Sequence, residues 1–344
     1  MEYKPLEQQY KVISLQLLKK QNRVIAKNSG ASLIDLGDNV ALLEFHSPNN
    51  AVGPDIIWMI EKAVEETERN YKGLVIGNEG KNFCVGANLA LMLMEAQDEN
   101  LFELDYMIRK FQQAMMKIKY SKQPVIAVPR QKALGGGAEI CLVAARIQAS
   151  PETYIGLVET GVGLIPGGGG TKELYIKHLE SMPECVDFSL QDIAVKVFET
   201  IALAKVSTSA EEGKTLGFLN EKDAISNNDD HVIYDAKQVV LRLYEEGYQP
   251  PVRKKVPVTG ETGYAAMLTG AQYLYHSGYI SKYDLTIAKK LAYVVAGGKL
   301  PYGTKVDEQY LLNLEREAFL ELIAKPETQM RMQHMLRTGK PLRN

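Results

Sequence analysis

Two glutamates, Glu139 and Glu159, stand out because each lies in a glycine-rich segment. A carboxylic acid held beside a reacting bond can donate or accept a proton, and a pair of such groups can do both. Glu139 follows Gly135-Gly136-Gly137, where a strand that ends near Val128 is expected to pass into a helix that begins near Ala138. Glycine has no Cβ, and the first N–H groups of a helix have no intrahelical partner. A ligand that develops negative charge could therefore be stabilised at this turn.

Two further segments have a similar composition. Residues 82–88 follow a short strand that is expected to end near Gly77. Residues 159–171 contain six more glycines, and Pro166 interrupts them. The turn at Val85-Gly86 could present a second backbone N–H to the same ligand. Two amides from separate turns would form an oxyanion hole, which stabilises the charged oxygen of an enolate.

Each of these features also has a structural explanation. Glycine runs are usually turns, a glutamate at the start of a helix is usually a partner of the helix dipole, and Glu159 could be a surface acid. The patterns of two nucleotide sites are not met. A dinucleotide-binding GxGxxG would need glycine at Pro166, after Gly161 and Gly163. A P-loop would need Gly-Lys-Thr, whereas the chain has Gly170-Thr171-Lys172.

Together the three segments resemble the enoyl-CoA hydratase/isomerase (crotonase) superfamily. The first family signature, Phe-x-Ala-Gly-Ala-Asp, is similar to Phe83-Cys84-Val85-Gly86-Ala87-Asn88. The second, Gly-Gly-Gly-x-Glu, is matched by residues 135–139. The third, Phe-Gly-x-Pro-Glu followed by Pro-Gly-x-Gly-Gly-Thr, is similar to residues 155–159 and 165–171. The resemblance covers about residues 31–250 in order and spacing, and it resumes near the end of the chain.

The resemblance implies a role for each matched residue. The N–H groups of Val85 and Gly136 would form the oxyanion hole around a thioester carbonyl. Glu139 would activate the water that attacks C3 and Glu159 would deliver the proton to C2, and this division stays open because both acids can contact the same water. The substrate would be an acyl-CoA thioester, with no cofactor and no metal. The residues expected to contact it are Gly86, Ala87, Asn88, Gly135 and Gly137.

The chain departs from the family pattern at three places. Val85 replaces the usual Ala, which leaves the backbone N–H in place, while Asn88 replaces Asp and Leu157-Val158 replaces x-Pro. The latter two changes concern contacts with the acyl chain or CoA and leave both acids. Members that only isomerise double bonds often lack the acid at Glu139, so the pattern favours a hydratase. The alternatives are an isomerase or another acyl-CoA enzyme of this fold, or a non-catalytic subunit of a β-oxidation assembly.

The surrounding sequence alternates between strand and helix patterns. Two apolar runs around Gly37-Asp38-Asn39 predict a β-hairpin, and spacings of three and four predict helices. This alternation predicts an α/β body with parallel pairing, and the resemblance implies a crotonase-like ββα spiral core with a C-terminal helical region. The predicted elements are hairpin strands at 32–36 and 40–46, a helix from Pro54, a strand at 74–77, a helix over 101–118 and a strand at 124–128.

Three regions are expected along the chain. Residues 1–30 are expected to be a leader or linker, residues 31–250 the catalytic core and residues 251–344 a helical region. Within the core, Ser209 and Glu212 predict a capping box at the start of a helix. Further on, the segment 248–257 reads as a linker whose basic residues 253–255 are solvated, with a contact to CoA phosphates as the alternative. The C-terminal region resembles one that folds over the active site and supports trimers.

The stretch 260–310 is longer than in simple family members, and it resembles the hydratase part of multifunctional β-oxidation proteins. Those proteins join the hydratase to a 3-hydroxyacyl-CoA dehydrogenase. Since the chain has no dinucleotide fingerprint, the dehydrogenase step is not expected from it. The predicted partners are copies of the same chain in a trimer-based oligomer, with a dehydrogenase or a thiolase as a further partner.

The composition narrows the class of protein. A net charge of -2 argues against a nucleic-acid partner. No apolar run approaches the roughly 20 residues that a membrane span requires. Three cysteines without a CxxC pair argue against a disulfide framework and favour the cytoplasm. No histidine has a metal-ligand partner at a useful spacing, so all are predicted to be structural or solvated: His46, His178, His231, His276 and His334.

Overall fold

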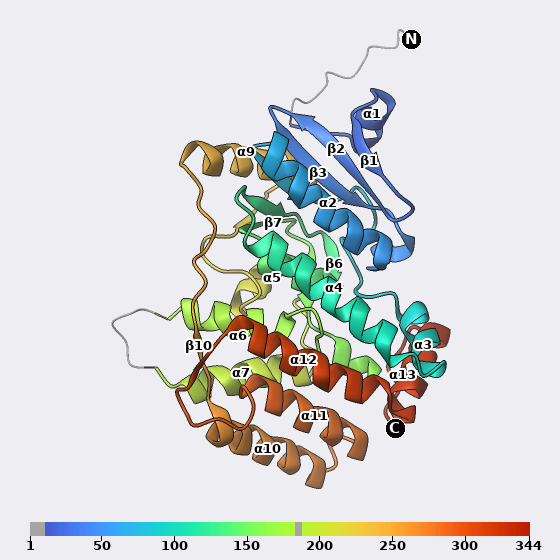
Figure 1. Ribbon diagram of the computed structural model, residues 1–344, viewed down its shortest axis with the longest axis vertical. Helices are drawn as coiled ribbons and strands as arrows, with labels where there is room; N and C mark the ends of the chain where they lie inside the picture. Colours follow the sequence, from blue (N-terminus) through green and yellow to red (C-terminus); the bar gives the residue numbers. More distant parts are fainter. Residues whose placement is uncertain (1–10, 183–187) are drawn as a thin grey trace.

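The computed structural model describes residues 11–182 and 188–344, and within them a seven-stranded β-sheet forms one end of the molecule (Figure 1). The strand order is β1-β2-β3-β4-β5-β7-β9. The pairs β1–β2 and β2–β3 are antiparallel, and every later pair is parallel. The predicted hairpin and the predicted parallel body are confirmed. The strands are β1 (Val24–Lys27), β2 (Ala31–Gly37), β3 (Val40–Phe45), β4 (Gly73–Ile76), β5 (Val125–Ala127), β7 (Arg146–Ala149) and β9 (Ala224–Ile225).

Alternate side chains of the sheet enter two hydrophobic cores. On β3, Leu43 joins the larger core together with α2 (Pro54–Asn70) and α4 (Leu101–Lys119). Its neighbour Leu42 joins a smaller core on the opposite face, which α9 (Val232–Glu245) covers. Because both faces are buried, the central strands read as continuous apolar runs rather than as alternating patterns.

The segment before the hairpin is structured, which corrects the predicted leader over residues 11–30. Helix α1 (Leu15–Lys20) buries Leu15 in the smaller core, and the N–H of Leu15 donates to Glu79 Oε1 at 3.0 Å. Strand β1 extends the sheet by pairing with β2. A helix of six residues and a strand of four are too short to give a clear period in sequence. Residues 1–10 of the predicted leader lie outside the described residues.

The predicted capping box at Ser209 is only half formed. Ser209 Oγ accepts from the N–H of Glu212 at the start of α8 (Ala210–Thr215), as expected. The Glu212 carboxylate, however, accepts from the N–H and hydroxyl of Thr208 instead of the N–H of Ser209. Thr208 offers two donors together, so it outcompetes the single backbone donor of the motif. Gly217, at a φ of 85°, follows the last residues of this helix.

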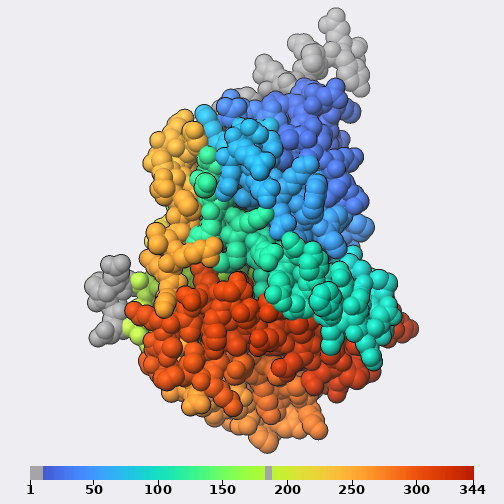
Figure 2. Space-filling model, viewed as in Figure 1, coloured from blue at the N-terminus to red at the C-terminus, as the bar shows by residue number. Residues whose placement is uncertain are grey.

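The C-terminal region is helical, as predicted, and it packs against the α/β part in one continuous hydrophobic core. Figure 2 shows it as a broad surface directly below that part. Its extended start, β10 (Val256–Pro257), pairs with β11 (Lys305–Val306). In the preceding linker, the guanidinium of Arg253 lies 4.2 Å from the ring centroid of Tyr120. The other α-helices are α3 (Leu89–Gln97), α5 (Gly136–Val143), α6 (Gly170–Glu180), α7 (Leu190–Ala202), α10 (Gly260–His276), α11 (Lys282–Val295), α12 (Glu308–Ile323) and α13 (Pro326–Thr338).

No helix in the described ranges, 11–182 and 188–344, combines the length and the apolar character needed to cross a membrane.

Candidate active site

The first two glycine-rich segments lie side by side, although about fifty residues separate them. Cys84 donates its N–H to Lys132 O at 3.1 Å and accepts at its carbonyl from the N–H of Leu134 at 2.9 Å. Lys132 and Leu134 belong to β6 (Gln131–Leu134), which pairs with β8 (Thr153–Gly156) away from the main sheet. This short pairing brings the turn after Cys84 against the turn that begins α5.

The two turns each offer a backbone donor at the same place. Gly135 precedes α5 at a φ of 53°, and Gly136 is the first residue of the helix. An added Cβ on Gly86 would lie 3.7 Å from the Gly136 nitrogen, so the two turns are in close contact at these two glycines. Within the part of the chain that the structure describes, the N–H groups of Val85 and Gly136 have no acceptor. Two unpaired N–H groups in adjacent turns are the donors an oxyanion hole requires.

A cavity of about 660 Å³ opens beside these donors. Its wall includes the predicted residues Val85, Gly86, Ala87, Gly135 and Gly136, together with both glutamates. Most of the remaining wall is apolar and comes from the helices around it. Those side chains are Val52, Ile57, Leu89, Met92, Met107, Ile108, Phe111, Val162, Leu164, Phe319 and Met335.

Two residues predicted to contact the substrate do not reach the cavity wall. Asn88 caps α3 instead, with Oδ1 accepting from the N–H of Leu91 at 3.2 Å. Gly137 faces the neighbouring turn, where an added Cβ would lie 2.5 Å from Cys84 O. A short polar side chain before a helix is often used as a cap, and glycine here permits close packing of two turns. Asn88 thus fixes the start of α3, and Gly137 lets the two turns pack closely.

Glu139 is buried in the first turns of α5 and is held by a third glycine-rich segment. Its Oε1 accepts from the N–H groups of Gly168 and Gly170, each at 2.8 Å. Burial raises the pKa of Glu139 to about 7, and the two amide hydrogen bonds act in the opposite direction. The carboxyl group can therefore change its protonation state near neutral pH.

Glu159 begins the short 3₁₀ helix η2 (Glu159–Val162) and approaches the same cavity from the other strand of the β6–β8 pair. A Cβ on Gly135 would lie 3.0 Å from Glu159 Oε1, which places this acid against the start of α5. Among the described residues no partner bonds the buried Oε2. Burial, and then the charge of Glu139, raise the pKa of Glu159 to about 8.

The C-terminal region supplies parts of the site that the sequence prediction did not name. Phe319 on α12 and Met335 on α13 line the cavity, and Gly339 and Pro341 follow them at its edge. Glu315 on α12 is fully buried and binds the glycine-rich segment behind Glu139. These residues lie more than 100 positions from the motifs, so motif spacing carries no signal for them. The resemblance implied that the C-terminal region folds over the active site, and the apolar face of a helix near the end of the chain agreed with this, but neither selected individual residues.

The cysteines and histidines have structural surroundings. Cys84 and Cys141 are buried, and burial raises the pKa of the Cys84 thiol to about 12, so it stays protonated. Burial also lowers the pKa of His178 to about 4. The third cysteine, Cys185, lies outside the described residues. Among the residues that are described, no group of histidine, cysteine and acidic side chains could hold a metal ion.

Comparisons with known proteins agree with this geometry. The family described as "Enoyl-CoA hydratase/isomerase" matches residues 35–180. A "Probable 3-hydroxyacyl-CoA dehydrogenase" of Bacillus subtilis (strain 168) is 63% identical over 343 residues, which is 100% of this chain and 43% of that protein. The "Peroxisomal fatty acid beta-oxidation multifunctional protein AIM1" of Arabidopsis thaliana is 30% identical over 200 residues, 57% of this chain and 25% of that protein. The chain thus spans less than half the length of either relative.

Solved structures show the same fold. The enoyl-CoA hydratase from Bacillus halodurans aligns with a TM-score of 0.59 at 15% identity, covering 89% of this chain and 99% of that one. An enoyl-CoA hydratase from Mycobacterium avium subsp. paratuberculosis K-10 aligns with a TM-score of 0.57 at 18% identity, covering 90% and 100%. The predicted fold class, an α/β crotonase-like core with a C-terminal helical region, is confirmed. Residues 35–180 thus match the enoyl-CoA hydratase/isomerase family, and the chain as a whole has the crotonase fold.

Proposed function

We propose that this chain is an enoyl-CoA hydratase that adds water across the 2,3 double bond of a trans-2-enoyl-CoA in fatty acid β-oxidation. One observation carries the proposal: two acceptor-free amides, the buried Glu139 and the half-buried Glu159 converge on one mostly apolar cavity. An apolar wall suits an acyl chain, and a pair of amides suits the oxygen that gains charge when water attacks an unsaturated thioester.

The proposed reaction uses each group once. Water adds through its oxygen to C3 while Glu139 takes one of its protons. The electron pair of the double bond moves toward the thioester, whose carbonyl oxygen becomes negative between the N–H groups of Val85 and Gly136. Glu159 then gives a proton to C2 and the carbonyl re-forms. The product carries one added water, and a proton passed from Glu139 to Glu159 through solvent restores the starting state.

The surroundings of the two acids support this division. Two amide hydrogen bonds favour the ionised form of Glu139, as a base requires. The charge of Glu139 is one of the causes that raise the pKa of Glu159, so Glu159 tends to hold its proton when Glu139 is ionised, as an acid requires. The unpartnered Oε2 of Glu159 is a suitable place for that proton.

We further propose that the chain corresponds to the hydratase part of a longer β-oxidation protein. Support comes from the relatives, which are more than twice as long and are named for dehydrogenase or multifunctional activity. In this proposal a dehydrogenase or thiolase unit acts on the product, copies of the chain assemble on a trimeric plan, and the protein works in the cytoplasm. Size measurement in solution and co-purification test the partners, and fractionation of cells tests the compartment.

The hydratase proposal is tested with crotonyl-CoA, whose conjugated enone absorbance disappears on hydration. The wild-type chain is expected to consume it and to form 3-hydroxybutyryl-CoA. Glu139→Gln and Glu159→Gln are each expected to lower kcat by roughly 10²- to 10⁴-fold, since each removes one proton-transfer group. Glu212→Gln, which alters an exposed carboxylate at the start of α8, is the matched control and should retain the full rate.

Product analysis separates the alternatives. A shifted double bond without added water would favour an isomerase, and turnover of another thioester would favour a different acyl-CoA reaction. Binding of acyl-CoA with no product in any case would favour a non-catalytic subunit. Wild-type rates in both glutamine variants would contradict the assignment of the acids. Reduction of NAD⁺ with 3-hydroxybutyryl-CoA by this chain alone would contradict the proposal that the dehydrogenase lies elsewhere.

A further inference from the structure

The glycine-rich loop 167–170 lies between the cavity and α6, and two buried carboxylates divide its amides between them. On the cavity side, Gly168 and Gly170 donate to Glu139 Oε1. On the opposite side, Gly169 donates to Glu315 Oε2 at 2.9 Å. The N–H of Lys172, in the first turn of α6, donates to Glu315 Oε1 at 2.8 Å. Successive amides of the loop thus alternate between an acid from α5 and an acid from α12.

We propose that Glu315 is a positioning residue for Glu139: by binding the amides on the far side of loop 167–170, it holds the near-side amides where they orient the Glu139 carboxylate. The inference rests on the proposed hydratase function, in which Glu139 acts as the base. Glu315 is fully buried and lies behind the loop, so it touches neither the cavity nor a reacting atom. Its effect must pass through the loop.

The loop has little support of its own in this conformation. Gly169 has a φ of 112°, a value that other residues rarely adopt, and its neighbours are also glycines. A run of four glycines has high conformational freedom, which must be lost if Glu139 is to be held in one place. The two hydrogen bonds to Glu315 supply that constraint, because each carboxyl oxygen accepts from a different backbone N–H and the side chain is itself fully buried.

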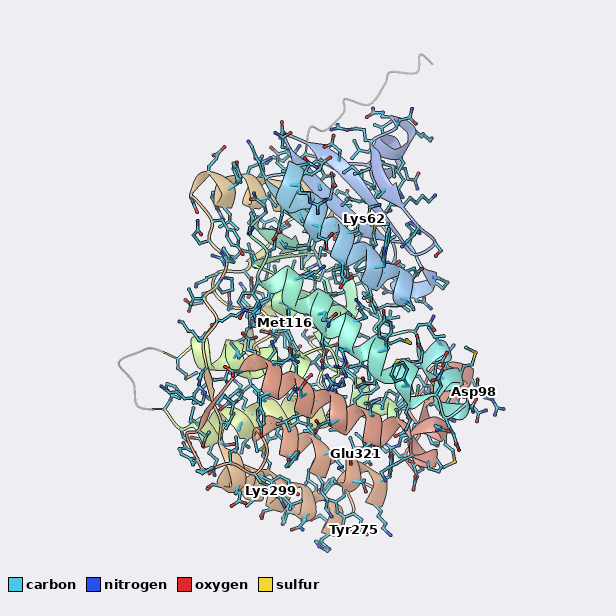
Figure 3. The ribbon with its side chains drawn as sticks, in the orientation of Figure 1. Lys62, Asp98, Met116, Tyr275, Lys299 and Glu321 are labelled. Atoms are coloured by element: carbon cyan, nitrogen blue, oxygen red, sulfur yellow. The ribbon has the colours of Figure 1, made fainter. Side chains whose placement is uncertain are left out.

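A second side chain connects the same elements. Gln112 on α4 is buried and donates through Nε2 to Gly167 O at 2.8 Å and to Leu312 O at 2.9 Å. Leu312 lies on α12, one turn before Glu315. Figure 3 shows the side chains between these two helices, with Met116 labelled on α4 and Glu321 on α12. The loop is therefore fixed to α12 from both of its ends.

The charges around Glu315 decide which substitution tests the idea. The carboxylate of Glu139 faces it across the loop, and Lys172 lies nearest among the cations. The Lys172 ammonium itself pairs with Glu173 and Glu308, in a cluster that Lys119 of α4 completes. Burial, and then the charge of Glu139, raise the pKa of Glu315 well above its ordinary value. Glu315→Asp keeps a carboxyl group beside Glu139 and shortens its reach to the loop by one methylene, so it isolates the positioning role.

The test compares Glu315→Asp with Glu308→Asp in crotonyl-CoA hydration. Glu308 is a matched control because it is a buried glutamate on the same helix that binds the side chains of Lys119, Tyr120 and Lys172 and no backbone amide of the loop. Glu315→Asp is expected to lower kcat about 10- to 100-fold with KM nearly unchanged, since the base is displaced while the cavity stays intact. The acidic limb of the pH profile should also move to higher pH, because the ionised Glu139 loses amide hydrogen bonds. Glu308→Asp should change neither property.

Hydrogen exchange of the amides at 168–172 is the second measurement, and it needs no activity. Faster exchange is expected in Glu315→Asp than in Glu308→Asp, each measured well below its own unfolding temperature. If Glu315→Asp does not fold, Glu315→Gln takes its place in the exchange measurement, since it keeps the length and loses one acceptor. If the wild type hydrates no enoyl-CoA, the proposed function fails, while exchange still decides whether Glu315 fixes the loop. An unchanged pH profile with unchanged exchange, or equal losses in the Glu308 control, would overturn the inference.

Discussion

The two acids of the cavity, the buried Glu139 and the half-buried Glu159, differ in how they are held. Glu139 projects from a regular helix, and two backbone amides grip one of its oxygens. Glu159 starts a short 3₁₀ turn, and its Oε2 is buried with no hydrogen-bond partner in the described chain. The first environment stabilises negative charge and fixes direction, whereas the second stabilises a proton. This difference underlies the proposed division, in which two identical side chains of one cavity have opposite tasks.

The support behind the acids differs in the same way. The amides that hold Glu139 are fixed in turn by Glu315 of α12. The turn that carries Glu159 is joined instead to α13, where Thr328 Oγ1 donates to Gly163 O at 2.8 Å. Each acid therefore depends on a different helix of the C-terminal region. That region covers the site and also completes it.

The largest effect is expected from removing both acids together. If Glu139 and Glu159 act as one unit, the Glu139→Gln/Glu159→Gln double variant should be no less active than the less active of the two single variants. Its kcat should therefore be roughly 10²- to 10⁴-fold below that of the wild type. The measurement is kcat for all three variants on crotonyl-CoA. If the loss of kcat in the double variant equals the product of the two single losses, the two acids contribute independently. That result would contradict the view that they act as one unit with complementary roles.

A smaller but still large effect is expected on the Glu139 side alone, from Gly168→Ala. The added Cβ would lie 2.3 Å from a ring carbon of Phe111 and 2.8 Å from Glu139 Oε2, so the acid or the loop must move. A displacement of about 1 Å can lower kcat by around 10²-fold. Gly270→Ala on α10, where no atom lies within 4 Å of the new Cβ, is the control and should keep full activity. Normal activity in Gly168→Ala would show that Glu139 does not need its present position.

A stability measurement addresses the Glu159 side. The folded pKa of Glu159 is raised from 4.5 to about 8, so the fold disfavours its ionised form and loses stability as pH rises between these values. The unfolding temperature of Glu159→Gln, relative to wild type, should therefore increase from pH 5 to pH 9, by at least about 2 °C. Glu212→Gln is the control, because its pKa is lowered and its contribution is constant above pH 5. A difference in unfolding temperature that stays constant from pH 5 to pH 9 would mean that the fold does not disfavour the ionised form of Glu159.

The smallest effect is expected where α13 supports the Glu159 turn. Thr328→Val removes the hydroxyl that bonds Gly163 O and the Tyr283 hydroxyl, and it should lower the free energy of unfolding by about 1–3 kcal/mol. We expect kcat to fall only a few-fold, because the turn keeps its own bond from the N–H of Leu164 to Glu159 O. Thr269→Val, on the exposed side of α10, is the matched substitution. The free energy of unfolding in denaturant and kcat are measured for both variants. A loss of kcat in Thr328→Val as large as that in Gly168→Ala would contradict the expected ranking.

The sequence predicted the features that depend on residues close together in the chain. The hairpin, the parallel strands and the two βα turns depend on local periods and on glycine, so residues 83–88 and 135–139 revealed the position of the donors. Strand β1 was missed because four residues carry too little pattern. The role expected for Asn88 gave way to helix capping, a local use of the same side chain.

The part of the site that escaped prediction is long-range. Glu315 lies 146 positions from Gly169, in a helix where Glu308, Glu317 and Glu321 look equally suitable in sequence. Only the packing of α12 onto the loop distinguishes Glu315, whose carboxyl group binds the loop amides, from the other three. A helical period gives the buried face to within one or two positions, which is too coarse to select one glutamate among four.

The structure of the chain with a bound acyl-CoA thioester tests the central claim most directly. The account predicts that the thioester oxygen lies about 2.7–3.1 Å from the nitrogens of both Val85 and Gly136. It also predicts that Glu139 and Glu159 face C3 and C2 from within the cavity. A thioester bound elsewhere, or a carbonyl oxygen beyond hydrogen-bond reach of these two amides, would contradict it.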